Sequence, residues 1–160
     1  MKKTSKKIVS ILLVILLMFF LLFLYNLSTY TAKSDIEAVD DIWNSDLENC
    51  ETIIYKYETN NKELILYKSK SGTTYECILN KKNIFGETRY KNDICYTSGF
   101  VTKLGAWNVV NRDFKYAIVN NENDIEKFDY GNDEFQCEKI DFTFSNGNHR
   151  VLYVYVIDKT

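Results

Sequence analysis

The sequence contains no proline, only one histidine, and none of the short motifs that mark common hydrolases and nucleotide-binding proteins. Gly-x-Ser-x-Gly, Ser-x-x-Lys with Lys-Thr-Gly, His-Glu-x-x-His, Walker A and Gly-x-Gly-x-x-Gly are all absent. The lack of proline, with abundant Lys, Asn, Ile and Tyr, is the bias of an AT-rich coding sequence and says nothing of function. Without a catalytic signature, we expect no catalytic residue and no cofactor.

The chain also lacks an excess of positive charge. It has 20 basic and 22 acidic residues, and four of the lysines fall within residues 1–7. The rest of the chain therefore holds 16 basic and 22 acidic side chains, a net charge of −6. A domain of this sign repels phosphate backbones, so we do not expect nucleic-acid binding.

Only the N-terminus carries a long hydrophobic run. Residues 8–25 are 18 side chains of which Ser10 alone is not apolar, and as a helix they span about 27 Å, close to the hydrocarbon thickness of a bilayer. Four lysines precede the run and one, Lys33, follows it closely, so the positive-inside rule predicts a cytoplasmic N-terminus. We expect a basic tail over 1–7, a single transmembrane helix over 8–27, a linker over 28–34 and an extracytoplasmic domain over 35–160.

A cleaved signal peptide is the competing interpretation of this run. The apolar core of a signal peptide has roughly 7–15 residues and ends at small residues in an Ala-x-Ala pattern. Here the run is longer, and the best cleavage candidate, Tyr30-Thr31-Ala32, has a bulky ring where a small side chain is needed. No cysteine follows the run as a lipoprotein anchor would require. Both interpretations export the domain.

Residues 35–48 have the pattern of one amphipathic helix. Ser34 and Glu37 form a capping-box sequence, in which each side chain satisfies a free backbone N–H at the helix start. Apolar residues follow at helical spacing, with acidic residues on the other side; they are Ile36, Val39, Trp43 and Leu47. We expect this helix to pack over a sheet rather than bind a partner.

Beyond Cys50 the apolar pattern changes to a period of two, which predicts strands. Turn signals lie at Asn60-Asn61, at Ser71-Gly72 and at 145–148, where Asn-Gly favours a type I′ hairpin, and we expect a polar loop at 80–83. Residues 151–157 are apolar on both faces, as in a central strand. The predicted strands are 51–58, 63–70, 73–79, 94–102, 107–110, 114–119, 135–144 and 149–157, with 124–129 as a ninth.

This order of elements predicts an α+β, mainly β fold: a transmembrane helix, then one amphipathic helix packed on an antiparallel sheet or sandwich of eight to nine short strands. The high aromatic content, 15% with 12 Tyr, fits half-buried strands on which rings pack across the pleat.

Five segments of the chain carry a resemblance to a known family. They are the helix after Ser34, the hairpin ETIIYKYETNNKELILYKSK, the element KKNIFG at 81–86, the strand YAIV at 116–119 leading to Asp124-Ile125, and the hairpin ending in NGNHRVLYVYV. Over residues 35–157 the chain resembles an uncharacterised family of small exported or membrane-anchored proteins of Bacillus and related Gram-positive bacteria. It departs from that family at Glu87, where a Trp usually follows the Phe-Gly pair, and lacks the Gly-rich run after it. The resemblance implies an extracytoplasmic β-rich domain and no particular activity.

The four cysteines all follow the membrane segment, where three disulfide pairings are open. Cys77 and Cys95 each lie nine residues from Gly86, as expected of facing positions in a hairpin, and Cys50 with Cys137 would then form the second bridge. Four reduced, buried thiols are the alternative. The cysteines are not in the close pairs that structural zinc sites use, so we expect no metal there.

Three other groups of residues could carry chemistry. His149 has Ser145 and Asp141 within reach across a hairpin, but we expect an exposed ring in a turn. The loop 129–134 is rich in oxygen ligands without the spacing of a calcium-binding EF-hand, and we expect a polar turn. The stretch 99–107, with Phe100, Lys103, Gly105 and Trp107, could be an aromatic-lined binding loop, although we expect its rings to close the core.

The leading hypothesis is a non-catalytic, membrane-tethered binding or interaction domain on the outer face of a Gram-positive envelope, with a protein or envelope component as partner. One alternative is a hydrolase of envelope polymers using paired carboxylates; its candidates are Asp129, Asp133, Glu134 and Asp141. Another is a membrane-anchored immunity or inhibitor protein.

Overall fold

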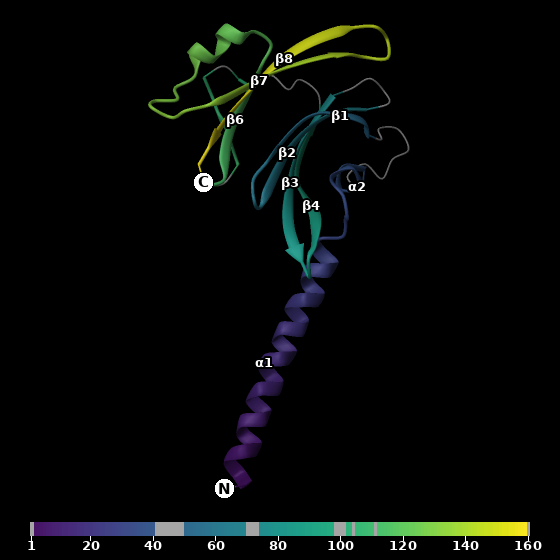
Figure 1. Ribbon diagram of the computed structural model, residues 1–160, viewed down its shortest axis with the longest axis vertical. Coiled ribbons are helices and arrows are strands. Elements are labelled where there is room, and N and C mark those ends of the chain that lie inside the picture. The colour runs from purple at the N-terminus through teal and green to yellow at the C-terminus, as the bar shows by residue number, and fades with distance from the viewer. Residues whose placement is uncertain are drawn as a thin grey trace.

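The computed structural model describes residues 2–40, 50–69, 74–97, 102–103, 105–110 and 112–159. A long helix, α1, projects like a stalk from a β domain made of two sheets that lie beside each other (Figure 1). This is the mainly β, α+β fold that the sequence predicts, with eight strands among the described residues.

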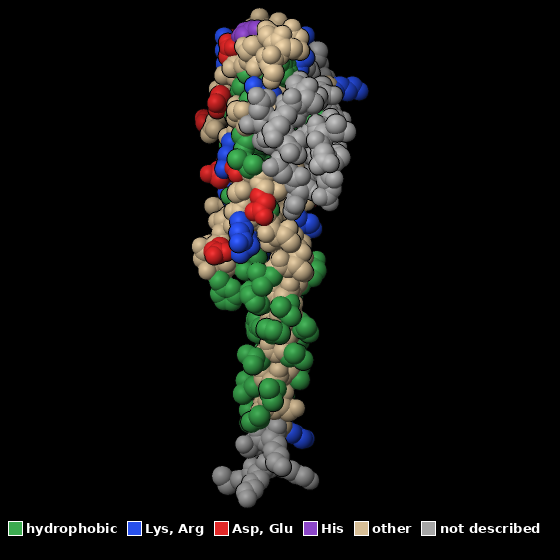
Figure 2. All heavy atoms as spheres, turned by 90° about the vertical axis from the view of Figure 1, so that its right-hand side faces the viewer, with side chains coloured by type: hydrophobic (Ala, Val, Ile, Leu, Met, Phe, Trp, Pro, Cys, Tyr) green, Lys and Arg blue, Asp and Glu red, His purple; other side chains and the backbone are tan. Residues whose placement is uncertain are grey.

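Helix α1 runs over Lys2–Thr29. Its stretch from Lys7 to Thr29 is long and apolar enough to cross a membrane, with a mean hydropathy of 3.1 in its most apolar window. None of that window is buried by the rest of the protein, and Leu16, for example, is 68% exposed. Figure 2 shows hydrophobic side chains covering the face of α1 in view, whereas the acidic side chains lie higher up, on the β domain. A helix that is apolar and exposed on all sides is suited to lipid rather than to water.

Helix α2 spans Asp35–Asp40 and begins where the capping box predicts. The Glu37 N–H donates to Ser34 Oγ at 3.1 Å, and the Glu37 carboxylate accepts from the Lys33 N–H at 2.7 Å. The predicted continuation over 41–48, with Trp43 and Leu47, lies outside the described residues.

The buried side of α2 differs from the predicted stripe. Ala38 and Val39 are buried against the first sheet, whereas Ile36 is 49% exposed. On the same helix Asp35 faces the sheet, where its carboxylate lies 3.0 Å from Lys56 Nζ.

The first sheet has the order β1-β2-β3-β4 and is antiparallel throughout. Its strands are β1 Cys50–Glu58, β2 Lys62–Ser69, β3 Thr74–Ile84 and β4 Glu87–Thr97. The predicted hairpin around Asn60-Asn61 joins β1 to β2. The predicted polar loop at 80–83 is wrong, because these residues extend β3 and pair with β4 as far as Ile84 opposite Glu87. Strand β4 consequently begins seven residues before the predicted start at 94, since cross-strand pairing outweighs the low strand propensity of Lys and Asn.

The turn between β3 and β4 has two residues, Phe85 and Gly86, and both have positive φ, 53° and 82°. This is the pattern of a type I′ turn, in which Asn-Gly is the preferred pair. A side chain larger than Asn in the left-handed region costs about 1–2 kcal/mol. Phe85 is therefore held in a backbone conformation that its side chain disfavours.

The second sheet has the order β5-β6-β8-β7, again antiparallel. Its strands are β5 Asn108–Val110, β6 Phe114–Val119, β7 Gln136–Thr143 and β8 His149–Asp158. Strand β8 lies between two neighbours, as its apolar faces predict, with Val154 facing one core and Tyr155 the other. The predicted strand at 124–129 is wrong. Residues Glu122–Lys127 form a 3-10 helix, η2, because the Asn121 side chain caps it by accepting from the Asn123 N–H.

The two sheets pack face to face around one shared core, and each outer face has a smaller core of its own. In the shared core Tyr57 of β1 meets Phe114 of β6 edge to face at 5.2 Å. The outer face of the first sheet is covered by Ala32, Ala38 and Val39. On the outer face of the second sheet, Phe128, Ile125 and Trp107 cover β6 and β8. The buried members of the shared core are Tyr55, Leu64, Leu66, Ile78, Val110, Phe114, Tyr116, Ile118, Ile140, Phe142, Leu152, Val154 and Val156.

Candidate functional site at the junction of helix and sheet

Helix α1 is fastened to the β3–β4 hairpin by side-chain contacts near its C-terminal end. The rings of Phe23 and Phe85 meet edge to face with centroids 4.9 Å apart. Lys82 Nζ donates to Asn26 Oδ1 at 2.8 Å and lies 5.8 Å from the centre of the Tyr30 ring. These contacts place the tip of the hairpin beside the apolar part of the helix.

The backbone strengthens the same junction. Ala32 forms an isolated antiparallel bridge with Tyr90, whose N–H donates to the Ala32 carbonyl at 2.9 Å. Ala32 is 2% exposed and belongs to the core on the outer face of the first sheet. The predicted linker over 28–34 thus consists of the end of α1 and a segment paired to β4, the edge strand of its sheet.

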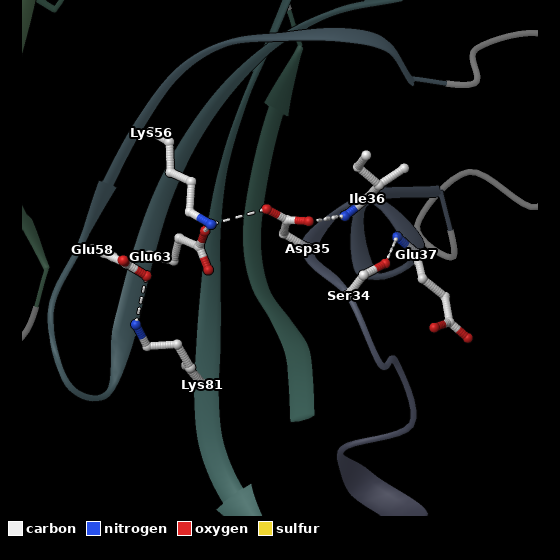
Figure 3. Close-up of polar contacts among 8 residues, drawn as sticks. All are labelled: Ser34, Asp35, Ile36, Glu37, Lys56, Glu58, Glu63 and Lys81. Atoms are coloured by element: carbon white, nitrogen blue, oxygen red, sulfur yellow. Dashed lines mark hydrogen bonds and ion pairs between the residues drawn. The ribbon is translucent and has the colours of Figure 1, made fainter. Parts of the chain in front are cut away.

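A cluster of charged side chains links α2 to the outer face of the first sheet (Figure 3). Lys56 of β1 lies between two carboxylates, 3.0 Å from Asp35 Oδ2 and 2.6 Å from Glu63 Oε1. A second ion pair lies beside this cluster, with Lys81 Nζ 2.9 Å from Glu58 Oε2. Lys56 therefore joins the first turn of α2 to strand β2.

Glu63 is the unusual member of this cluster, because its side chain is completely buried. Burial raises the pKa of Glu63, and the contact with Lys56 opposes that rise. For Lys56 burial acts to lower the pKa, but the contacts with Glu63 and Asp35 outweigh it and raise the pKa above the ordinary value. Among the described residues neither Glu63 oxygen receives a well-aligned hydrogen bond, so its charge is balanced by the ion pair alone.

Sequence reasoning missed a buried polar pair between the two sheets. Glu76 of β3 is 5% exposed and accepts a hydrogen bond from the Tyr116 hydroxyl of β6. Burial raises the pKa of Glu76 to about 7, and the bond from Tyr116 acts against that rise. The signal was present in the sequence: Glu76 occupies the same face of its strand as Ile78, which lies in the shared core.

The structure sets Cys77 directly opposite Cys95 in the register of β3 and β4. Cys77 is buried, Cys137 is exposed on β7, and Cys50 begins β1. The side chains of Cys50 and Cys95 lie outside the described part of the chain, so both disulfides stay predictions.

His149 Nε2 lies 2.5 Å from Asp141 Oδ1 near the β7–β8 turn, with both side chains more than half exposed. Ser145 lies in the same turn and is exposed. With exposures of 57% and 56%, the two side chains have the character of a solvated surface contact, as expected for a ring in a turn.

The acidic loop 129–134 is held by its own contacts. Asp129 Oδ1 accepts from the Gly131 N–H, and Asp133 pairs with Lys115 at 2.7 Å. Over the described ranges, no group of three or more His, Cys, Asp or Glu side chains is placed to hold a metal ion. In the predicted aromatic loop, 98–101 and 104 lie outside the described residues, but Trp107 packs on Phe128 and donates to the Asp129 carbonyl at 2.9 Å.

Two open hollows adjoin at Asp158, near the C-terminal end. One of about 330 Å³ is lined by Asp133, Glu134 and neighbouring residues of β7 and β8. The other, of about 360 Å³, is lined by 58–60 and Lys81. Of the four carboxylates expected for a hydrolase, only Asp133 and Glu134 reach a hollow; Asp129 and Asp141 line neither.

The chain matches no protein-family model, no curated protein and no solved structure. Its function is therefore inferred from the placement of its own residues. The most extensive arrangement among them is the junction in which α1, the β3–β4 hairpin and α2 are fixed to one another. This arrangement fixes the position of the β domain relative to α1.

Proposed function

We propose that the protein is a single-pass membrane protein whose β sandwich is held outside the cytoplasm of a Gram-positive cell as a non-catalytic binding or interaction domain. The observation that carries the proposal is α1, which is apolar and exposed and is fixed to the first sheet at its C-terminal end. With the helix in a bilayer, the domain rests at the membrane surface. The lysines before the helix support a cytoplasmic N-terminus.

The hollows at Asp158 support binding of a protein or envelope component rather than of a small molecule. Small-molecule sites are usually enclosed and mostly apolar, whereas these hollows are open and their lining includes Glu58, Asp133 and Glu134. Outside residues 1–7 the chain has a net charge of −6. A partner segment carrying basic groups suits this surface.

Protease treatment of intact cells tests the anchoring and its direction. The expected result is that added protease degrades the β domain of the wild-type protein, which stays in the membrane fraction after alkaline washing. A variant with all four lysines in 1–7 replaced by Glu is expected to lose this orientation, because the positive-inside signal is removed. The matched control replaces the same lysines by Arg and keeps it. A wild-type domain that protease cannot reach contradicts the proposal.

Cross-linking in cells tests the interaction surface. The expected result is a cross-linked partner that is lost with Glu134→Lys, which reverses a charge in the hollow. The control is Glu126→Lys, an equal change on the exposed surface of η2, which lies outside both hollows. Equal cross-linking by Glu134→Lys and Glu126→Lys would contradict the proposal that the partner binds at the hollow.

A further inference from the structure

The β3–β4 turn carries an apolar ring, Phe85, at an exposed position whose backbone conformation favours a smaller residue. Phe85 is 86% exposed, more than any other large hydrophobic side chain in the described part of the chain. Its positive φ suits Asn or Gly. In a domain surrounded only by water, a polar residue at this position would serve the turn better. The ring therefore requires an apolar environment outside the protein.

The position of Phe85 along α1 defines that environment. Its partner ring, Phe23, lies two residues before the end of the apolar run at Tyr25, which is about 3 Å along a helix axis. The bonds from Lys82 to Asn26 and from Tyr90 to Ala32 prevent the hairpin from rising away from the helix. When α1 crosses a bilayer, Phe85 is held at the boundary between hydrocarbon and headgroups.

A groove continues from Phe85 along the helix. It has a volume of about 540 Å³ and is lined by Phe85 and by six Leu and Phe side chains of α1 between Leu13 and Phe23. The helix rises about 15 Å over those residues, half of a typical hydrocarbon core. An apolar groove of this length, open along a helix of membrane-spanning length, fits an acyl chain of the adjoining leaflet.

Basic side chains flank the turn at the level expected for headgroups. Lys82 and Arg89 face each other across the hairpin. They lie two strand positions farther from the turn than the pair Ile84 and Glu87, which adjoins it. Two strand positions correspond to about 7 Å. Arg89 is paired with Glu87 at 2.7 Å, and the long stems of both basic residues let their charges reach the phosphate level.

We propose that the Phe85 turn inserts into the leaflet next to the β domain and that, with α1, it encloses a lipid acyl chain. The domain then touches the membrane at two points, the helix and the hairpin tip. The inference rests on the proposed function in one respect, that α1 lies in a bilayer.

Depth-dependent fluorescence quenching of the full-length protein in lipid nanodiscs tests this proposal. Three single variants each add one tryptophan: Phe85→Trp at the turn, Leu16→Trp in α1, and Ser145→Trp at the β7–β8 turn, far from α1 in Figure 1. The nanodiscs contain phosphatidylcholine without bromine or with bromine on the acyl chain, either near the headgroup, at the depth expected for Phe85, or near the chain end, at the depth expected for Leu16. Wild-type emission is subtracted to remove the native tryptophans.

Insertion predicts that brominated lipid removes at least half of the emission added by Phe85→Trp, whose spectrum is blue-shifted, while Ser145→Trp is unchanged. Unquenched emission from Phe85→Trp with quenched Leu16→Trp overturns the inserted turn and leaves the anchor intact. Unquenched Leu16→Trp overturns the membrane anchor as well. Should Phe85→Trp fail to fold, Glu87→Trp, at an exposed position next to the turn, reports the same depth.

Discussion

Replacing Glu76 by glutamine should remove most of the pH dependence of stability of the β domain between pH 5 and 8. The carboxyl group is buried between the sheets and its pKa is raised to about 7, from about 4.5 for an exposed glutamate. Folding therefore favours the protonated form. The stability that this group contributes is complete below pH 4.5 and is lost as the pH rises toward 7.

The size of the loss follows from the two pKa values. With 4.5 in the unfolded chain and about 7 in the folded domain, the free energy of unfolding falls by about 2–3 kcal/mol between pH 5 and 8. Glutamine keeps the shape and still accepts the bond from Tyr116, but it has no proton to lose. At pH 8 the variant should be more stable than the wild type by about 2 kcal/mol.

Urea unfolding of the full-length protein in detergent micelles measures this difference. Trp107, half-buried against Phe128, reports the folded state through its fluorescence. Glu126→Gln, an exposed change on η2, is the matched control and should follow the wild type. A small slope should remain in Glu76→Gln, because the raised pKa of Glu63 acts in the same direction. Parallel pH curves for Glu76→Gln and the wild type would refute the reasoning.

Three further outcomes are expected. Phe85→Asn should have a free energy of unfolding in detergent about 1 kcal/mol higher than Phe85→Ala, because both variants lose the ring and only Asn tolerates the positive φ, as urea unfolding would show. Lys56→Met should lower the free energy of unfolding by about 1–3 kcal/mol, since the buried carboxylate of Glu63 loses its partner. Urea unfolding at pH 8 measures this change. Peptide mapping of protein prepared without reductant should recover a cross-linked peptide joining Cys77 to Cys95, which face each other in the hairpin.

Each of these outcomes has its own control. Equal free energies of unfolding for Phe85→Asn and Phe85→Ala would contradict the strain at the turn. Lys127→Met removes a surface ion pair with Asp124 and should cost less than about 1 kcal/mol. A sample treated with reductant should yield no cross-linked peptide. Recovery of Cys77 and Cys95 only in separate peptides from the sample without reductant would contradict the pairing.

Elements with a strong local pattern could be predicted from the sequence. The central position of β8 follows from apolar residues on both its faces, and the presence of a turn at 145–148 from its composition. The predicted type I′ geometry of that turn is wrong, because Gly147 has a positive φ of 84° and Asn146 does not. Cys77 and Cys95 face each other as predicted, but the two-residue turn alone would not align them: a register shift between Ile78 and Leu79 brings them opposite. Where the pattern was weak, partners elsewhere in the chain decided the structure: the polar residues 80–83 became strand because β4 pairs with them.

The candidate site was less accessible to sequence reasoning. The contact between Phe23 and Phe85 joins residues far apart in the chain, and each alone has an ordinary explanation as a membrane residue or a turn residue. Glu63 shares a strand face with Ile65 and Tyr67, which indicates burial, but its ion pair with Lys56 could not be predicted from the sequence. Only the three-dimensional arrangement brings these residues together.

The bridge between Ala32 and Tyr90 limits how far the domain can travel. Many tethered domains hang on long flexible segments and sample a wide volume around their anchor. Here only two residues separate the end of α1 from a backbone pairing with β4, so domain and helix turn and tilt together. The domain can therefore contact a partner only close to the membrane surface. A rotation of α1 about its own axis would rotate the β sandwich with it.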